Sequence, residues 1–161
     1  MIDHIGMNQK VNFEIPFSPK YPAKGAVTLT DGVGGYEDYH YNWLGWEGTD
    51  MTATVAFDSV ITFSVLKCNF LEDQKSWIFL PADVQFYYST DNVNFKFLGN
   101  RKGTEPVANK NANIETFSVA KKEFIKARYI KVVARNFKTC PKWHIGAGNP
   151  CWIFCDEIVV E

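Results

Sequence analysis

One stretch of this chain decides its class of fold: Ile61-Thr62-Phe63-Ser64-Val65-Leu66-Lys67-Cys68-Asn69-Phe70. Apolar and polar side chains alternate along it, which is the period of a β-strand. The apolar residues would lie on one face in the first half and on the other face in the second (Ile61, Phe63 and Val65; Leu66, Cys68 and Phe70). A ten-residue strand that is apolar on both faces is expected between two layers or at the centre of a sheet.

Further strands are expected on both sides of this one. Period-two patterns occur at residues 11–15, 51–57, 84–89, 95–98, 129–134 and 152–160. The residues between 89 and 95 include Asp and Asn, which favour turns, so the strands 84–89 and 95–98 should form a hairpin. Helical periodicity is scarce, and residues 120–126 are the one helix-like stretch, about one turn long. About eight short strands separated by turns predict an all-β fold, a jelly-roll β-sandwich.

Length and charge limit the classes of function. A chain of 161 residues is most simply one domain, so residues 1–161 are interpreted as a single β-sandwich module. A net charge of −1 without a basic block argues against nucleic-acid binding. No apolar run approaches the roughly 20 residues that cross a bilayer, so membrane insertion is not expected. Residues 1–4 do not open a signal peptide, and the chain is expected to be a module of a longer, exported protein.

The four cysteines, Cys68, Cys140, Cys151 and Cys155, allow two interpretations. Cys140 and Cys151 could form a disulfide that closes the loop between them, or all four could be free and buried, which free cysteines usually are. We favour the second. Cys151 and Cys155 lie four residues apart in an expected strand, about 13 Å from each other, so they cannot bridge. The same separation argues against a zinc site that would join them to Cys140 and His144.

All five tryptophans fall in stretches typical of loops or strand ends. The negative face of an indole suits the C–H face of a pyranose ring, and Asn, Asp and His side chains suit the sugar hydroxyls. An aromatic platform with a few orienting polar groups is therefore a candidate sugar site. Its candidate residues are His40, Trp46, Asp73, Trp77, Trp143, His144 and Asn149. Trp43 and Trp152 adjoin expected strands and are interpreted as structural.

No motif indicates catalysis. Asp156 and Glu157 are neighbours in an expected strand, so their carboxylates point to opposite faces and cannot flank one glycosidic bond. Neither a Gly-x-Ser-x-Gly elbow nor a His-Glu-x-x-His pair occurs. The loop at residues 30–35 joins Asp31 to three glycines and could present oxygens to Ca²⁺. Taken alone, a simple Asp-Gly turn explains this loop better.

Segments along nearly the whole chain together resemble the discoidin-like domain, also called the coagulation factor V/VIII type C domain, which shares its fold with family 32 carbohydrate-binding modules. The segments are residues 29–32, Trp43, 53–57, 89–95, 127–132 and 156–158. A further set is similar to the C-terminal module of bacterial family 20 β-N-acetylhexosaminidases, or chitobiases: residues 20–25, 43–48, 77–81 and 140–144. The catalytic barrel of those enzymes is absent from this chain.

The resemblance implies a jelly roll with a structural Ca²⁺ held by Asp31, Glu157 and the carbonyl of Val33. It also implies a sugar site at one end of the sandwich, among the loops 40–47, 72–77 and 143–149. Trp46, Trp77 and Trp143 are then expected to converge at that end.

The resulting hypothesis is a non-catalytic, carbohydrate-binding accessory module of a bacterial chitobiase that is secreted, periplasmic or at the cell surface. Its partners would be glycans that contain N-acetylhexosamine or galactose, and the catalytic domain of the same chain. The alternative is a structural module that packs against the catalytic barrel and binds no sugar. An independent hydrolase is the third and weakest hypothesis.

Overall fold

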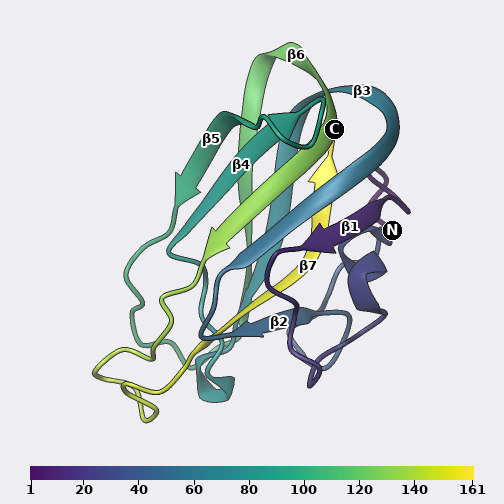
Figure 1. Cartoon of the computed structure of the whole chain (residues 1–161). Coiled ribbons are helices and arrows are strands. Elements are labelled where there is room, and N and C mark those ends of the chain that lie inside the picture. The colour runs from purple at the N-terminus through teal and green to yellow at the C-terminus, as the bar shows by residue number, and fades with distance from the viewer.

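The computed structural model describes residues 1–161 and is built from seven β-strands and two 3-10 helices (Figure 1). The strands are β1 (Lys10–Phe13), β2 (Leu44–Glu47), β3 (Met51–Glu72), β4 (Asp83–Ser89), β5 (Lys96–Lys102), β6 (Asn113–Arg135) and β7 (Trp152–Val160). The helices are η1 (Gly25–Thr30) and η2 (Gln74–Ser76). Neither helix has the length or apolar character to cross a membrane. The prediction of an all-β fold is confirmed.

Hydrogen bonds join the strands into one antiparallel sheet of order β2-β7-β3-β6-β4-β5, with β1 paired to β3. The strands β3 and β6 are long enough to run through two layers, and both turn over at the top of the molecule in Figure 1. Residues 65–72 of β3 pair with β7 and with the first half of β6, whereas residues 51–56 pair with β1 and with the second half of β6. The continuous sheet therefore folds into a β-sandwich.

The stretch from Ile61 to Phe70 lies at the sheet centre as predicted, but a bulge changes which faces its side chains occupy. The register of β3 against β6 shifts between Phe63 and Val65. The backbone N–H groups of Ser64 and Val65 both donate to the carbonyl of Glu161. Because a bulge adds one residue to the alternation, Phe63 shares the core face with Leu66, Cys68 and Phe70. The prediction of an apolar pattern divided between two faces was therefore wrong.

Two further local predictions were wrong. Residues 120–126 form part of β6 instead of a helical turn, and Ile125 and Lys126 pair with β3. Residues 44–47 form β2, paired with β7, although they were interpreted as loop. Long-range pairing overrides weak local propensity in both cases. Gly45 permits the pairing of β2 with β7, because a Cβ at this position would lie 2.5 Å from the Phe154 ring.

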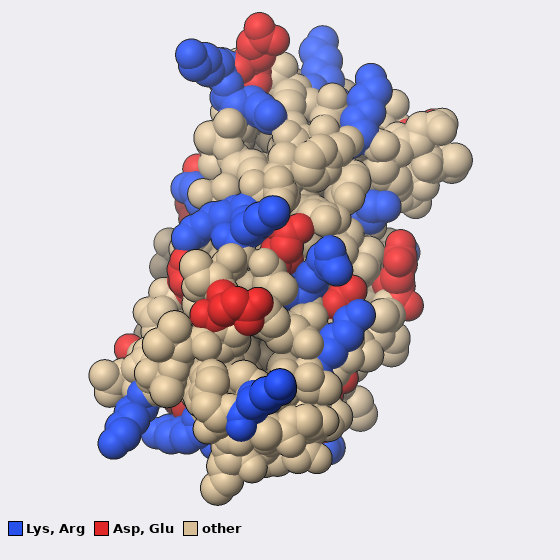
Figure 2. All heavy atoms as spheres, turned by 90° about the vertical axis from the view of Figure 1, so that its left-hand side faces the viewer, with Lys and Arg blue, Asp and Glu red and all other residues tan.

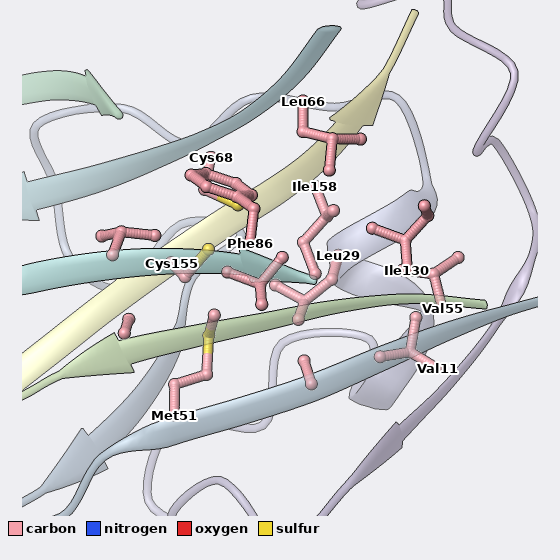
Figure 3. Packing of buried hydrophobic residues seen from close by; sticks show 14 of the residues in the cluster. Val11, Leu29, Met51, Val55, Leu66, Cys68, Phe86, Ile130, Cys155 and Ile158 are labelled. Atoms are coloured by element: carbon pink, nitrogen blue, oxygen red, sulfur yellow. The ribbon is translucent and has the colours of Figure 1, made fainter. Parts of the chain in front are cut away.

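The main core lies between the two layers. Val55, Ile130 and Phe86 extend from one layer toward Leu66, Cys68, Cys155 and Ile158 of the other, and Leu29 of η1 and Val11 of β1 complete one side (Figure 3). Each of the side chains from β3, β4, β6 and β7 is fully buried. Burial of a large aliphatic or aromatic side chain contributes about 1.5–3 kcal/mol. The core therefore holds the end loops on a rigid frame.

All four cysteines are buried and free, as the favoured interpretation predicts. Cys140 and Cys151 pack with Phe79 in a small cluster beneath the loop that joins them. Burial raises the pKa of the Cys151 thiol to about 12. These buried thiols therefore serve as packing groups beneath the loop, and the Cys151 thiol also donates to Asn136 Oδ1 at 3.2 Å.

Candidate functional site

A cleft of about 600 Å³ lies where η2 meets two loops at one end of the sandwich. We call it the tryptophan cleft, and its lining is Gln74, Lys75, Ala108, Asn109, Lys110, Trp143, His144 and Ile145. Three smaller cavities contain no tryptophan. Figure 2 shows the side of the molecule that is on the left in Figure 1. The lower end of this side is mainly uncharged, and the charged side chains that protrude there are mostly Lys or Arg.

The η2 turn places one wall of the cleft. Asp73 exchanges two backbone hydrogen bonds with Ile78, and its Oδ2 accepts one from the Ser76 hydroxyl at 2.9 Å. The turn ends at Trp77, whose φ of 66° is left-handed and reverses the chain. Asp73 was a candidate sugar ligand, but it is buried and its carboxylate holds the turn. It supports the site from beneath.

His144 joins the η2 turn to the loop that carries Trp143. Its Nε2 lies 2.6 Å from the Gln74 carbonyl, and its Nδ1 accepts the N–H of Gly146 at 3.0 Å. One ring nitrogen donates and the other accepts, so these bonds fit the neutral Nε2–H tautomer. The ring also makes edge contacts with Trp77 and Trp143, at centroid distances of 6.0 and 5.9 Å. His144 therefore fixes the cleft wall with both nitrogens already in use.

Gln74 holds the third segment of the cleft. Its Nε2 donates to the Val107 carbonyl at 2.9 Å, and its Oε1 accepts the backbone N–H of Asn109 at 2.8 Å. The Asn109 Oδ1 accepts the N–H of Asn111 at 3.0 Å. One buried amide side chain thus ties a loop without regular structure to the η2 turn. The cleft is held in shape before any ligand arrives, a property that reduces the cost of binding.

Trp143 and Ile145 are the apolar surface of the cleft. The Trp143 side chain is 46% exposed and Ile145 is 94% exposed. The Trp143 ring packs edge-on against Phe79, with ring centroids 6.3 Å apart. Trp77 is half-buried beneath the same loop, and a Cβ on Gly146 would lie 2.9 Å from its ring. The Trp143 ring is therefore held by aromatic neighbours and is about half exposed at the cleft.

The other predicted sugar residues lie outside the cleft. Trp46 is a core residue of β2, where its ring packs with Phe13 and its indole N–H donates to the Ile15 carbonyl at 3.0 Å. The predicted convergence of three tryptophans was therefore wrong for Trp46. His40 is exposed and bonded to Asp38 in another loop. The Asn149 side chain closes its own loop by donating to the carbonyl of residue 146.

The structural interpretation of Trp43 and Trp152 is confirmed, because both side chains are buried. Trp43 donates its indole N–H to the Tyr36 carbonyl at 2.8 Å. Sequence reasoning missed the loop residues Ala108, Asn109 and Lys110. Gln74, Lys75 and Ile145 lie within the predicted loops 72–77 and 143–149 but were not among the individual candidate residues. No sequence pattern connects residues 107–110 with residues 143–145.

Of the residues predicted to hold Ca²⁺ (Asp31, Val33 and Glu157), the two carboxylates form a second polar site with His4 and Lys24. We call these four residues the carboxylate clasp: His4, Lys24, Asp31 and Glu157. The Glu157 carboxylate is fully buried, lies 2.9 Å from His4 Nε2 and accepts the backbone N–H of Gly32. Asp31 accepts the Lys24 ammonium at 2.7 Å and the N–H of Val33 at 2.9 Å. Burial raises the pKa of Glu157, and the His4 bond opposes that rise.

The residues of the carboxylate clasp do not fit a calcium ion as they are arranged. Ca²⁺ takes six to eight oxygens, but the oxygens of Asp31 and Glu157 already accept protein donors, and the Val33 carbonyl accepts the Asn42 amide at 2.6 Å. One neighbouring buried oxygen, Asp156 Oδ1, lacks a partner. No group of three or more acidic, His or Cys residues is arranged to hold a metal. Calcium at this place stays a prediction, and it would require His4 and Lys24 to move away.

Neither protein-family models nor curated protein sequences provide a match to this chain. Solved structures do. The family 32 carbohydrate-binding module of EndoD from Streptococcus pneumoniae has a TM-score of 0.63 and 11% identity over 99% of both chains. The chain has the fold of a family 32 carbohydrate-binding module. The resemblance to the discoidin-like fold is therefore confirmed.

Two further structures share this fold. The C-terminal domain of a chitobiase from Bacteroides fragilis has a TM-score of 0.56 and 16% identity, over 99% of this chain and 97% of that domain. The family 32 module of NanJ from Clostridium perfringens, solved with galactose, has a TM-score of 0.56 and 12% identity, over 94% and 92%. The chain also aligns with the larger protein SpGH29 at a TM-score of 0.55 and 13% identity, over 98% of this chain but 27% of that one.

Proposed function

We propose that this protein is a non-catalytic carbohydrate-binding module that holds a glycan in the tryptophan cleft. The observation that carries the proposal is the half-exposed Trp143 ring, supported from behind by Phe79 and His144. Such a ring offers a flat apolar face to the C–H face of a sugar. The shared fold with carbohydrate-binding modules supports the same function.

The glycan is proposed to contain galactose or an N-acetylhexosamine. Galactose is the sugar bound in the NanJ module, and the chitobiase domain shares the fold. The module would belong to an exported bacterial glycoside hydrolase of the chitobiase type. There it would keep substrate close to the catalytic domain and raise its effective concentration.

A glycan array followed by calorimetric titration tests the proposal. Trp143→Ala is expected to weaken binding at least tenfold, which corresponds to about 1.4 kcal/mol. The matched control is Phe124→Ala on β6, since Phe124 is an exposed aromatic residue remote from the cleft lining. Sugar binding of unchanged affinity in Trp143→Ala would contradict the proposed site.

A second function is favoured by the exposure of Ile145, which is 94% exposed next to Trp143. Together with the half-exposed Trp143 it forms an apolar surface patch, and exposed apolar patches often mark protein contact surfaces. The module would then pack against the catalytic domain of its own chain and bind no sugar. In the intact parent enzyme, Ile145→Ser would lower the melting temperature of the catalytic domain if this function holds. Under the glycan-binding proposal it would leave that temperature unchanged.

A further inference from the structure

Most polar groups that line the tryptophan cleft are already bonded within the protein. The Gln74 amide holds the 107–109 segment, and both ring nitrogens of His144 are in use. The Asn109 side chain accepts one backbone N–H and donates weakly, at 3.4 Å, to Glu72. These groups shape the cleft but leave little hydrogen-bonding capacity for a ligand.

The exceptions are two lysines. Lys75 and Lys110 line the cleft from different segments, and neither takes part in an ion pair or a side-chain hydrogen bond. Three of the fourteen lysines have a carboxylate partner, Lys20 with Glu47, Lys24 with Asp31 and Lys67 with Glu161, and Lys75 and Lys110 are among those without one. No Asp or Glu lines the tryptophan cleft. Its lining therefore carries two positive charges and no negative charge, beside a half-exposed indole ring.

An acidic cavity adjoins the tryptophan cleft. This cavity, of about 360 Å³, is lined by Glu72, Glu105 and Glu115 and shares Ala108 and Asn109 with the tryptophan cleft. Two of its carboxylates already have protein partners: Gln74 and Asn109 donate to Glu72, and Arg101 pairs with Glu115. The segment at residues 108–109 thus separates an acidic cavity from a basic cleft.

We propose that the glycan bound in the tryptophan cleft carries an anionic group, a carboxylate or a sulfate, that lies against Lys75 and Lys110 while a sugar ring packs on Trp143. The inference deepens the proposed function and rests on it. A lysine ammonium is a flexible point charge that accommodates either anion. Unpaired lysines at a ligand site favour an anion by direct attraction, which added salt weakens. A neutral sugar would gain nothing from either charge.

Calorimetric titration of the whole chain with matched sugars tests this inference. The sugars are galactose, galactose 6-sulfate and galacturonic acid, so the last two distinguish a sulfate from a carboxylate. At about 50 mM salt at least one anionic sugar is expected to bind at least fivefold more tightly than galactose. The difference in affinity between the anionic sugar and galactose should decrease at about 500 mM salt, where the screening length falls to a few ångströms. Equal or weaker binding of both anionic sugars would overturn the inference.

Variants then test whether Lys75 and Lys110 cause the preference for an anionic sugar. The double variant Lys75→Gln and Lys110→Gln is expected to lose the preference for the anionic sugar and to retain the affinity for galactose. The control, Lys121→Gln with Lys122→Gln, removes the same charge from exposed positions of β6 and should keep the preference. A preference that survives loss of Lys75 and Lys110 would also overturn the inference.

The two proposals fail in different ways. Galactose binding that depends on Trp143, with no anionic preference, leaves the proposed function intact and removes only this inference. Absence of binding to every glycan on an array that includes sulfated and uronic acid sugars would remove both.

Discussion

The carboxylate clasp and the tryptophan cleft lie on the same sandwich, and the family resemblance predicts a ligand at each, Ca²⁺ at one and a sugar at the other. In the clasp, the carboxylates of Asp31 and Glu157 already accept donors from His4, Lys24 and the backbone. In the cleft, the Trp143 ring is about half exposed and two lysine ammonium groups have no carboxylate partner. The comparison teaches how to judge a binding site that is expected from the fold. Groups that lack a partner within the protein are better evidence for such a site than the types of residue present.

The largest expected effect concerns the carboxylate clasp. Glu157→Ala should lower the free energy of unfolding by about 3–5 kcal/mol, because it leaves the buried His4 imidazole and the Gly32 N–H without their acceptor. Chemical denaturation measures this change. Glycan affinity of the folded fraction should be unaffected, because the clasp contributes no residue to the cleft. A loss below about 1 kcal/mol would show that the clasp is not a structural element.

An intermediate effect is expected at the tryptophan cleft. Gly146→Ala places a methyl group against the Trp77 ring, where the Cβ would lie 2.9 Å away. Overpacking of this kind costs about 1–3 kcal/mol, and it should displace the His144 turn and weaken glycan binding severalfold. Thermal denaturation and calorimetric titration measure the two effects. The neighbouring, exposed Ala147→Ser is the control, and unchanged affinity in Gly146→Ala would argue that the cleft is not preorganised.

The smallest expected effect is that of calcium. Because the His4 imidazole and the Lys24 ammonium already bond to the carboxylates of the clasp, millimolar Ca²⁺ or EDTA should shift the melting temperature by less than about 1 °C, which is well below 1 kcal/mol for a chain of this size. Lys24→Gln frees one oxygen of Asp31 but leaves Glu157 bound to His4, so it should not create calcium dependence. A rise of several degrees with Ca²⁺ would instead support the metal site implied by the resemblance.

The sequence predicts the parts of this molecule that depend on local pattern. The strand at 152–160 and the hairpin of β4 and β5 follow from alternation and turn residues. The bulge near Val65 does not, because the carbonyl of Glu161 that accepts both N–H groups lies almost 100 residues away. For the same reason Trp46 was misplaced, since its burial depends on pairing of β2 with β7.

The candidate site likewise has one part that the sequence predicts and one part that it does not. Trp143 and His144 were recognisable from their chemistry and their neighbours in the chain. The segment at residues 107–110 was not, because it reaches the cleft through the bonds between Gln74, Val107 and Asn109. These contacts join residues more than 30 positions apart, and no periodicity encodes them.

The most direct test of the central claim is a two-dimensional NMR titration that follows the five indole N–H signals as a bound glycan is added. The Trp143 signal is predicted to shift in a saturable manner. The signals of Trp43 and Trp46, whose N–H groups donate to Tyr36 and Ile15 inside the fold, should stay unchanged. Saturable binding that leaves Trp143 unmoved, or that shifts Trp43 or Trp46 instead, would contradict the assignment of the tryptophan cleft as the binding site.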